Sequence, residues 1–528
     1  MAENMAGGPA QVLSVALGRR VRLDSSVAAE SVVAVSPDEL APAAAALIAA
    51  GGHHAMLVAF EKPGRASGRA SKARESKARP AVEEVVWLPN GPIVRLRAEL
   101  GSGALADTAA PRYPSLTPAI PAAQWDEREA HDVYGIVAAG HPDPRPLLDN
   151  ANAKPFVAHG DGVYQLPVGP IHAGIIEPGH FRFSAVGEMV VHLDARLFYT
   201  HRGIERLVEG RTFAEALPAV ERACGVCTVT HATAFSLAVE RLTGTEILAS
   251  ARLARVLLAE MERLYNHVGD LGNLCAGVGF NFGTSRLGWL KERLVRLNEG
   301  LTGHRYLTGM VVPGGLRRPL DPNALAALSA AVHEIDAEVR SVVRFLVRSE
   351  GFMNRLHGTG VLTREAALRF GVVGVAARAS GVAADLRRDL PYGAYPELQV
   401  DVAFASSGDV AARFHVRAME ISASVALVTE TAATLATMAA AHAMALPNVP
   451  LVREPKPGDS TVVGVEGPRG ASWLWLMAGP GGRVAGVHLR SASFANWPAV
   501  PSVVPGNVVP DFPLINKSFE LCYACTDR

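Results

Sequence analysis

This sequence is poor in cysteine and has no excess of charge of either sign. Five cysteines among 528 residues exclude a fold that depends on a disulfide framework and favour a reducing compartment. Lysine plus arginine and aspartate plus glutamate each number 51, which argues against a nucleic-acid binder that relies on net positive charge. We therefore expect no nucleic-acid partner.

A cleavable signal and a long uninterrupted hydrophobic run are also lacking. The N-terminus, MAENMAGGPAQVL, has no basic region followed by a long apolar run. The longest alanine-rich apolar segment, at about residues 423 to 445, is interrupted by Thr429, Glu430, Thr431 and His442. This pattern predicts a buried helix rather than a membrane span, so membrane association would come through partners.

The chain is long enough for two domains or more. Residues 1 to 150 contain short β-branched segments, an alanine-rich helical stretch, and two strands that turn at Pro89-Asn90-Gly91, which predicts a small α+β domain. Within it, residues 62–80 are rich in Lys, Arg, Ser, Ala and Gly and predict a disordered loop. The polar residues 151–163 predict an interdomain linker.

Helical periodicity dominates from about residue 210 to 440, and two strands are predicted later, at 461–465 and 484–489. One long helix is indicated by a stripe of apolar residues at three- and four-residue spacing: Leu253, Val256, Leu257, Leu264, Val268 and Leu271. On this helix Glu262/Asn266 and Arg263/His267 are four residues apart and are expected to interact, as polar contacts between helices.

Four of the five cysteines form two Cys-x-x-Cys pairs, Cys224/Cys227 and Cys522/Cys525. Each pair can place two thiolates on one metal ion, and four thiolates suit zinc, nickel or iron. A structural zinc site usually has both pairs within a few tens of residues, whereas about 300 residues separate these. Independent redox motifs are also an alternative, although neither flank shows a βαβ pattern. The fifth, Cys275, is expected to be a buried core thiol.

The segment WDEREAHDVYGI at residues 125–136, with His141 beyond it, combines acids and two histidines. A metal site is one interpretation. A salt-bridged helix start that forms a docking surface is the favoured one.

The residues around the cysteine pairs carry a family resemblance. ERACGVCTVTH (221–231) and NKSFELCYACTDR (516–528) resemble the cysteine motifs of nickel–iron hydrogenase large subunits, specifically the membrane-associated, complex I-related group 4 that includes the hydrogenase of formate hydrogenlyase. GPIH (169–172), EPGHFR (177–182) and HRGIE (201–205) look like further motifs of this family. Residues 1–150 are similar to the complex I 30-kDa subunit fused to some members.

The resemblance implies an α+β fold class with three parts. These are a 30-kDa-like α+β docking domain (1–150), the linker (151–163), and a large, mainly α-helical hydrogenase-like and 49-kDa-like catalytic domain with peripheral β-strands (164–528). The implied localisation is cytoplasmic, on the inner face of the cell membrane.

In this family four thiolates bind nickel, and two of them also bind an iron that carries two cyanides and one carbon monoxide. The resemblance assigns Cys224 and Cys522 as terminal nickel ligands and Cys227 and Cys525 as the bridges to iron. The chain has no further iron–sulfur motif, so the implied electron partner is a [4Fe–4S] small subunit of complex I type. A ferredoxin-like subunit and complex I-like membrane subunits are the other implied partners.

Three more residues match family positions. Glu177 matches the proton-relay glutamate, Arg469 the arginine over the open metal position, and Ser493 a donor to a cyanide nitrogen. With Cys522, a terminal thiolate that can act as a base, Glu177 and Arg469 form the expected catalytic set.

The last residue departs from the family pattern. Many members have a histidine there that binds magnesium together with the acid of the RGxE motif, whereas this chain has Arg528 and the matching acid Glu205. We predict a Glu205–Arg528 ion pair in place of magnesium.

The expected activity is the reversible conversion of two protons and two electrons to H2. Residues 262–267, 379–381 and 408–410 also match patterns of the complex I subunit that lines the quinone pocket. The alternative is therefore a quinone-reductase or redox-coupling subunit without hydrogenase activity, and a third possibility is a structural zinc scaffold. Complex I subunits lack the two cysteine pairs, so we favour the hydrogenase.

Overall fold

The computed structural model describes residues 8–24, 26, 28–62, 79–100, 110–149, 154–174, 176–440 and 448–528. The predicted disordered loop at 62–80 lies outside the described residues except at its two ends. Of the predicted linker 151–163, the structure describes 154–163. Residues 154–162 have no regular secondary structure, Val163 begins a strand, and the Phe156 ring contacts His192.

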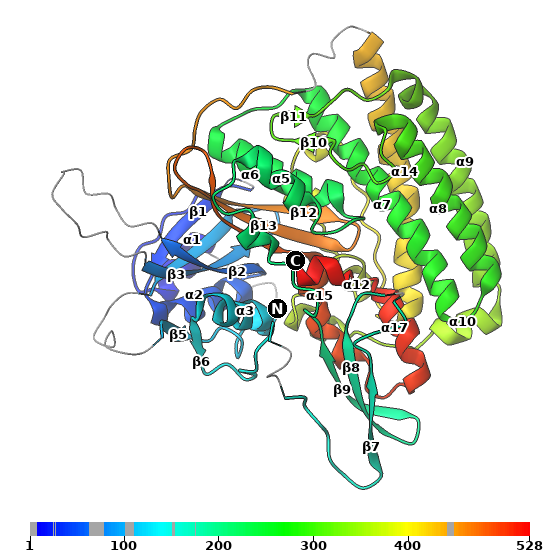
Figure 1. Cartoon of the computed structure of the whole chain (residues 1–528), viewed down its shortest axis with the longest axis horizontal. Helices are drawn as coiled ribbons and strands as arrows, with labels where there is room; N and C mark the ends of the chain where they lie inside the picture. The colour runs from blue at the N-terminus through cyan, green and yellow to red at the C-terminus, as the bar shows by residue number, and fades with distance from the viewer. Residues whose placement is uncertain are drawn as a thin grey trace, which may run out of the picture.

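The N-terminal portion is a four-stranded sheet covered by helices (Figure 1). The strand order is β1-β4-β3-β2, with β1 parallel to β4 and the other pairs antiparallel. The predicted strand pair is confirmed, because β3 and β4 are antiparallel neighbours on either side of the turn at Asn90. The elements of this portion are α1 (Pro9–Ala16), β1 (Glu30–Val35), α2 (Pro37–Ala49), β2 (His53–Lys62), β3 (Arg79–Trp87), β4 (Ile93–Glu99), β5 (Arg112–Pro114), η1 (Pro121–Ala123), α3 (Gln124–Tyr134) and β6 (Val137–Ala139).

A second sheet, which the sequence analysis did not predict, projects from the periphery of the molecule (Figure 1). It consists of β7 (Val163–Val168), β8 (His180–Val186) and β9 (Met189–Arg196), all antiparallel. Phe181, Phe183 and Ala185 alternate on its buried face, which is the period of a half-buried strand.

Four long helices lie side by side in the helical region (Figure 1): α7 (Ala249–Gly277), α8 (Asn281–Thr302), α9 (Pro322–Val347) and α14 (Val410–Ala440). The predicted apolar stripe of α7 is buried. Among the described residues, α14 alone is long and apolar enough to cross a membrane by length and composition. It packs on α7 and α9 with Phe414, Val416 and Val428 buried, as a core helix does.

Shorter helices complete this region. They are α4 (Ile204–Leu207), α5 (Phe213–Glu221), α6 (Thr228–Thr243), α10 (Glu350–Leu356), α11 (Arg364–Arg369), α12 (Gly374–Ala379), α13 (Leu386–Asp389) and η2 (Tyr395–Glu397), with the strand pair β10 (Val311–Val312) and β11 (Gly315–Leu316).

A third sheet, β12 (Ser460–Gly467), β13 (Gly470–Ala478) and β14 (Val484–Arg490), is antiparallel and almost entirely buried. It packs between α6 and β2 of the N-terminal portion. The expectation of peripheral strands is therefore wrong for this sheet, and β13 was not predicted. The chain ends with α15 (Ala492–Asn496), η3 (Trp497–Ala499), α16 (Val500–Val503), η4 (Val509–Asp511), α17 (Phe512–Phe519) and α18 (Tyr523–Asp527).

Charged contacts connect the N-terminal portion to this buried sheet. Arg95 donates to the carbonyl of Ser460 at 2.8 Å, and Asp126 on α3 lies 3.1 Å from Arg490 at the end of β14. Asp126 and Glu129 are buried. The segment 125–136 thus contains a salt-bridged helix, as the sequence favoured.

Candidate metal centre

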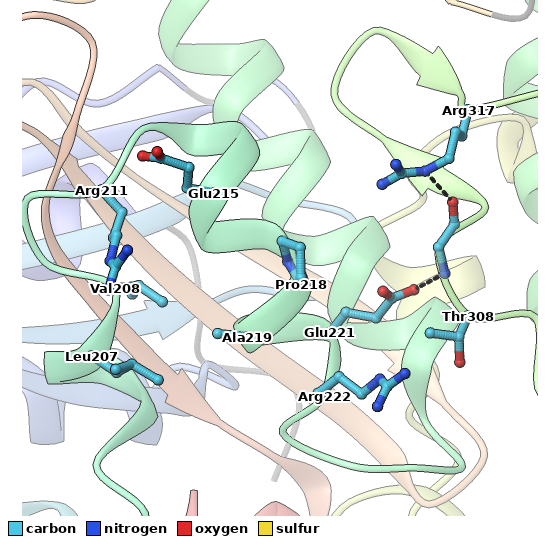
Figure 2. Close-up of a pocket in the computed structure, with 11 residues that line it drawn as sticks. Leu207, Val208, Arg211, Glu215, Pro218, Ala219, Glu221, Arg222, Thr308 and Arg317 are labelled. Atoms are coloured by element: carbon cyan, nitrogen blue, oxygen red, sulfur yellow. Dashed lines mark hydrogen bonds between the residues drawn. The ribbon is translucent and has the colours of Figure 1, made fainter.

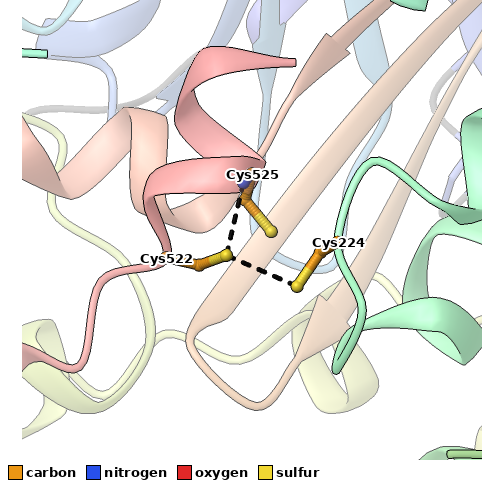
Figure 3. A group of neighbouring side chains, drawn as sticks. All are labelled: Cys224, Cys522 and Cys525. Atoms are coloured by element: carbon orange, nitrogen blue, oxygen red, sulfur yellow. Dashed lines mark hydrogen bonds between the residues drawn. The ribbon is translucent and has the colours of Figure 1, made fainter. Parts of the chain in front are cut away.

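The four cysteines of the two pairs converge. The Sγ atoms of Cys224 and Cys522 lie 3.4 Å apart, although 298 residues separate them along the chain. The Sγ atoms of Cys224, Cys522 and Cys525 all lie within 4.8 Å of one another (Figure 3), and Cys227 packs in the same buried cluster. All five cysteines of the chain are free thiols.

The first pair is a turn that leads into α6, for which Cys227 is the N-cap. The carbonyl of Val226 accepts hydrogen bonds from Tyr265 and from Asn266, both at 2.9 Å. The carboxylate of Glu262 accepts the backbone N–H of Val229 at 2.7 Å. An acid at a helix N-terminus satisfies amides that otherwise lack partners, so α7 fixes the position of this turn.

The two expected pairs on α7 do not interact side chain to side chain. Asn266 donates to the backbone carbonyl of Glu262 rather than to its carboxylate. Arg263 donates to the carbonyls of Glu466 and Gly467 on β12, and His267 Nε2 lies 2.8 Å from Glu420 on α14. The four-residue spacing does place each pair on one face, but neighbouring elements supply the partners because the helix is buried all round. The expectation of contacts between elements is confirmed.

The second pair is fixed through its backbone. Cys522 donates its N–H to the Ser493 hydroxyl at 2.9 Å, and the Ser491 hydroxyl donates to the Cys525 carbonyl at 2.9 Å. A hydroxyl that accepts a hydrogen bond still has a proton to donate, and among the contacts of the described residues the Ser493 hydroxyl acts only as an acceptor. The carboxylate of Asp527 accepts N–H groups of Phe198 and Thr200 at 2.9 and 3.0 Å.

Glu177 reaches the same motif from the segment before β8. Its carboxylate accepts the N–H of Ala524, between Cys522 and Cys525, at 2.8 Å. Partial burial and the neighbouring Cys522 raise the pKa of Glu177. Its side chain is exposed on the isolated chain, so it lies between the cysteines and the surface.

Arg469 occupies the tip of the hairpin that joins β12 to β13 and points at the cysteines. Its Nη1 lies 3.6 Å from Cys227 Sγ and donates to Asn266 Oδ1 at 2.9 Å, while Nη2 is 3.7 Å from Asp270 and Nε donates to the Glu520 carbonyl. Burial alone would lower the pKa of Arg469, but Cys227 and Asp270 keep it well above the ordinary value. The guanidinium is therefore a fixed positive charge beside the thiols.

Arg528 lies in a buried cluster of its own. Its Nη1 is 3.0 Å from Glu205, so the two residues form the ion pair that the sequence predicts. Its Nη2 donates to Glu129 on α3. His488 Nδ1 is 3.3 Å from Glu205. Burial would raise the pKa of Glu205, but His488 and Arg528 lower it to about 2.

The thiols are close enough to affect one another's ionisation. Hydrogen bonds with Cys224 and Cys525 lower the pKa of Cys227 to about 6, whereas the contact with Cys224 raises the pKa of Cys522 to about 12. Metal binding releases the protons of such thiols. The donor set is four sulfurs, and soft divalent metals prefer such sets.

An open hollow of about 570 Å³ lies against α5, which ends at Glu221 before the first cysteine pair (Figure 2). Arg211, Arg222 and Arg317 line it with Leu207 and Glu221. In the part of the chain that the structure describes, these three arginines form no ion pair within 4.0 Å.

Sequence reasoning missed several residues of the site. Asp270 carried a signal, because Glu262, Asn266 and Asp270 recur at four-residue spacing and form one polar stripe on α7 toward the cysteines. His488 carried none. Glu129 was signalled only as one acid of the segment 125–136, because each of the two residues meets Arg528 or Glu205 only through tertiary packing.

Comparisons with known proteins agree with this geometry. Residues 202–276 match the family described as nickel-dependent hydrogenase. Residues 287–528 and 33–158 match the 49 Kd and 30 Kd subunits of respiratory-chain NADH dehydrogenase. Hydrogenase-4 component G of Escherichia coli (strain K12) is 33% identical over 456 residues, which cover 80% of this chain and 77% of that protein.

The chain belongs to the complex I-related family of nickel–iron hydrogenase large subunits. Formate hydrogenlyase subunit 5 of the same organism is also 33% identical, over 80% of this chain and 78% of its own length. A chain in the structure of the membrane-bound sulfane sulfur reductase, an archaeal respiratory membrane complex, is 27% identical with a TM-score of 0.63, over 70% of this chain and 99% of its own.

Family membership has three consequences. It confirms the resemblance, including the fused 30-kDa-like and 49-kDa-like parts. It supports an oxidoreductase role. Because the relatives belong to multi-subunit membrane complexes, it also supports partners of that kind.

Proposed function

We propose that this chain is the catalytic large subunit of a complex I-related nickel–iron hydrogenase that interconverts H2 with two protons and two electrons. The observation that carries the proposal is the convergence of four free thiols, from segments 298 residues apart, beside one fixed guanidinium. A purely structural cross-link would not need a buried arginine 3.6 Å from a ligand sulfur.

The residues present fit a nickel–iron centre. All four donors are sulfur, and three of them lie within 4.8 Å of one another. Cys224 and Cys522 would be the terminal ligands of nickel, and Cys227 and Cys525 would bridge to iron. When bound, such a centre supplies the heterolytic chemistry of H2, and Ser493 has a free proton to donate to a cyanide ligand.

The chain's own residues would handle charge and protons. Arg469 supplies a positive charge that stays in place, because it donates to Asn266 and to the Glu520 carbonyl and cannot be deprotonated. Glu177 would exchange a proton with the Cys522 thiol, which contributes to its raised pKa. Its exposed side would pass that proton onward.

Family membership supports a proposal for the wider arrangement as well. We propose a docking domain at 1–150, a linker at 151–163 and a catalytic domain at 164–528. Electrons would leave through a [4Fe–4S] small subunit, with a ferredoxin-like subunit and complex I-like membrane subunits beyond it. The chain would lie peripherally on the cytoplasmic face of the membrane, and Arg528 would replace magnesium at Glu205.

The decisive experiment is metal analysis with infrared spectroscopy on protein isolated together with its maturation machinery. We expect one nickel and one iron per chain, and cyanide and carbonyl bands. Cys522→Ser should abolish hydrogen evolution, while Cys275→Ala at the unrelated core thiol should not. Four sulfurs filled by zinc would refute the proposal.

A second candidate is a quinone-reductase or redox-coupling subunit, because residues 287–528 match the 49 Kd subunit and relatives include NADH-quinone oxidoreductase subunits. This function does not require the thiols. Quinone reduction that persists in Cys522→Ser, without nickel in the parent, would favour it.

A further inference from the structure

Helix α3 of the N-terminal portion faces the end of the chain that carries the second cysteine pair (Figure 1). Two of its carboxylates, Asp126 and Glu129, are 1% and 4% exposed. Both are directed at arginines of the C-terminal segment, Arg490 and Arg528. Neither contact involves one of the four cysteines.

Glu129 fixes the last residue. Arg528 Nη2 donates to Glu129 Oε1, and Arg528 Nη1 to Glu205 Oε1 at 3.0 Å. The Arg528 carbonyl accepts the N–H of Arg202 at 2.7 Å. Arg528 is three residues beyond Cys525, so this cluster fixes the far side of the second cysteine pair.

Asp126 fixes the other side. Its two carboxylate oxygens lie 3.1 and 3.2 Å from Arg490 Nε. Arg490 immediately precedes Ser491, whose hydroxyl donates to the Cys525 carbonyl, and Ser493 follows, accepting the N–H of Cys522. The two serines that bind the backbone of the cysteine pair therefore lie within three residues of Arg490, which Asp126 of α3 contacts.

The physical chemistry makes these contacts demanding. The helix that carries Cys525, α18, has five residues, too few to be stable without tertiary contacts. Asp126, Glu129, Arg490 and Arg528 are all buried, and removing one member of a buried pair leaves an uncompensated charge. The position of the tail thus depends on α3 together with the contacts of Asp527 with Phe198 and Thr200.

We infer that Asp126 and Glu129 are positioning residues of the metal centre, through which the N-terminal domain holds Cys522 and Cys525 in place. The inference rests on the proposed function only in taking these cysteines as metal ligands. The geometry of the tail is independent of which metal they bind.

Hydrogen exchange on the metal-loaded full chain in its complex tests this inference. Glu129→Gln and Asp126→Asn keep the side-chain shape but remove the charge, and Asp38→Asn, exposed on α2 of the same domain, is the control. We expect the peptide 522–528 to exchange at least about tenfold faster in the first two variants, since the buried Arg490 loses its carboxylate partner in Asp126→Asn and the buried Arg528 loses one of its two in Glu129→Gln. The peptide 281–302 of α8 and the control variant should be unchanged.

Metal release to a chelator provides the second readout, followed as total nickel, iron and zinc per chain. It should also be at least about tenfold faster in Glu129→Gln, and Glu129→Asp, which keeps the charge, should lie between that variant and the parent. Parent-like exchange of 522–528 in both charge-removing variants would overturn the inference. Hydrogen exchange of the α8 peptide that is faster by the same factor would also overturn the inference, because Asp126 and Glu129 would then stabilise the whole fold rather than the tail. Finding zinc in the parent would refute the hydrogenase proposal and leave this test intact.

Discussion

Replacement of Glu177 by glutamine separates a proton carrier from a structural hydrogen-bond acceptor. The glutamine amide oxygen can accept the same N–H of Ala524 that Glu177 accepts at 2.8 Å. The loss of the charge on that bond should cost about 1 kcal/mol or less, because the side chain is exposed. The fold and the metal content should therefore not change.

The catalytic effect should be much larger. An amide cannot take up or release a proton near neutral pH, and a positioned acid or base contributes about 10²- to 10⁴-fold to a rate. We expect hydrogen evolution from a reduced viologen dye, and H2/D2O exchange, to fall at least about a hundredfold in Glu177→Gln. Glu188→Gln, an exposed residue of the turn between β8 and β9, is the matched control. A Glu177→Gln enzyme with normal nickel content and a rate within about threefold of the parent would refute the relay.

Three other substitutions test the surroundings of the site. In Gly374→Ala the new Cβ would lie 2.1 Å from the Arg469 carbonyl at φ +67°, so hydrogen evolution should drop at least about tenfold and stability by about 1–3 kcal/mol; an unchanged rate would contradict this reading. Burial lowers the pKa of His54, but Glu84 outweighs it and raises the pKa to about 9. The stabilisation is therefore complete below about pH 6.5 and lost as the pH rises through 9, so the urea midpoints of the parent and His54→Gln should converge above pH 9; a constant gap would argue against the pair. Cys275→Ala should lower the free energy of unfolding, measured in a melting experiment, by roughly 1 kcal/mol and should leave the metal content unchanged. Loss of nickel would show that this thiol has a role beyond core packing.

Much of the local structure could be predicted from the sequence. The apolar stripe of α7 has the period of a helix, and the strands at Pro89-Asn90-Gly91 have the pattern of a hairpin. These features depend on residues close together in the chain. The strand β13 was missed because ASWLWLMA does not alternate between apolar and polar residues. A strand that is buried on both faces lacks this alternation.

The candidate site divides in the same way. The cysteine pairs, Glu177, Arg469 and Ser493 could be named because their motifs are local and match a family. The contacts of Glu129 and His488 with the Arg528 cluster could not, because no spacing in the sequence relates residues 129, 205, 488 and 528.

The sequence by itself determined the ligand chemistry, the elements with a clear period and the family. Only the tertiary structure decided that thiols 298 residues apart lie 3.4 Å from each other and that the N-terminal domain contacts the last residue of the chain. The physical reason is that side-chain type and periodicity are local properties, whereas buried charges are paired by whichever elements the packing of the whole core brings together.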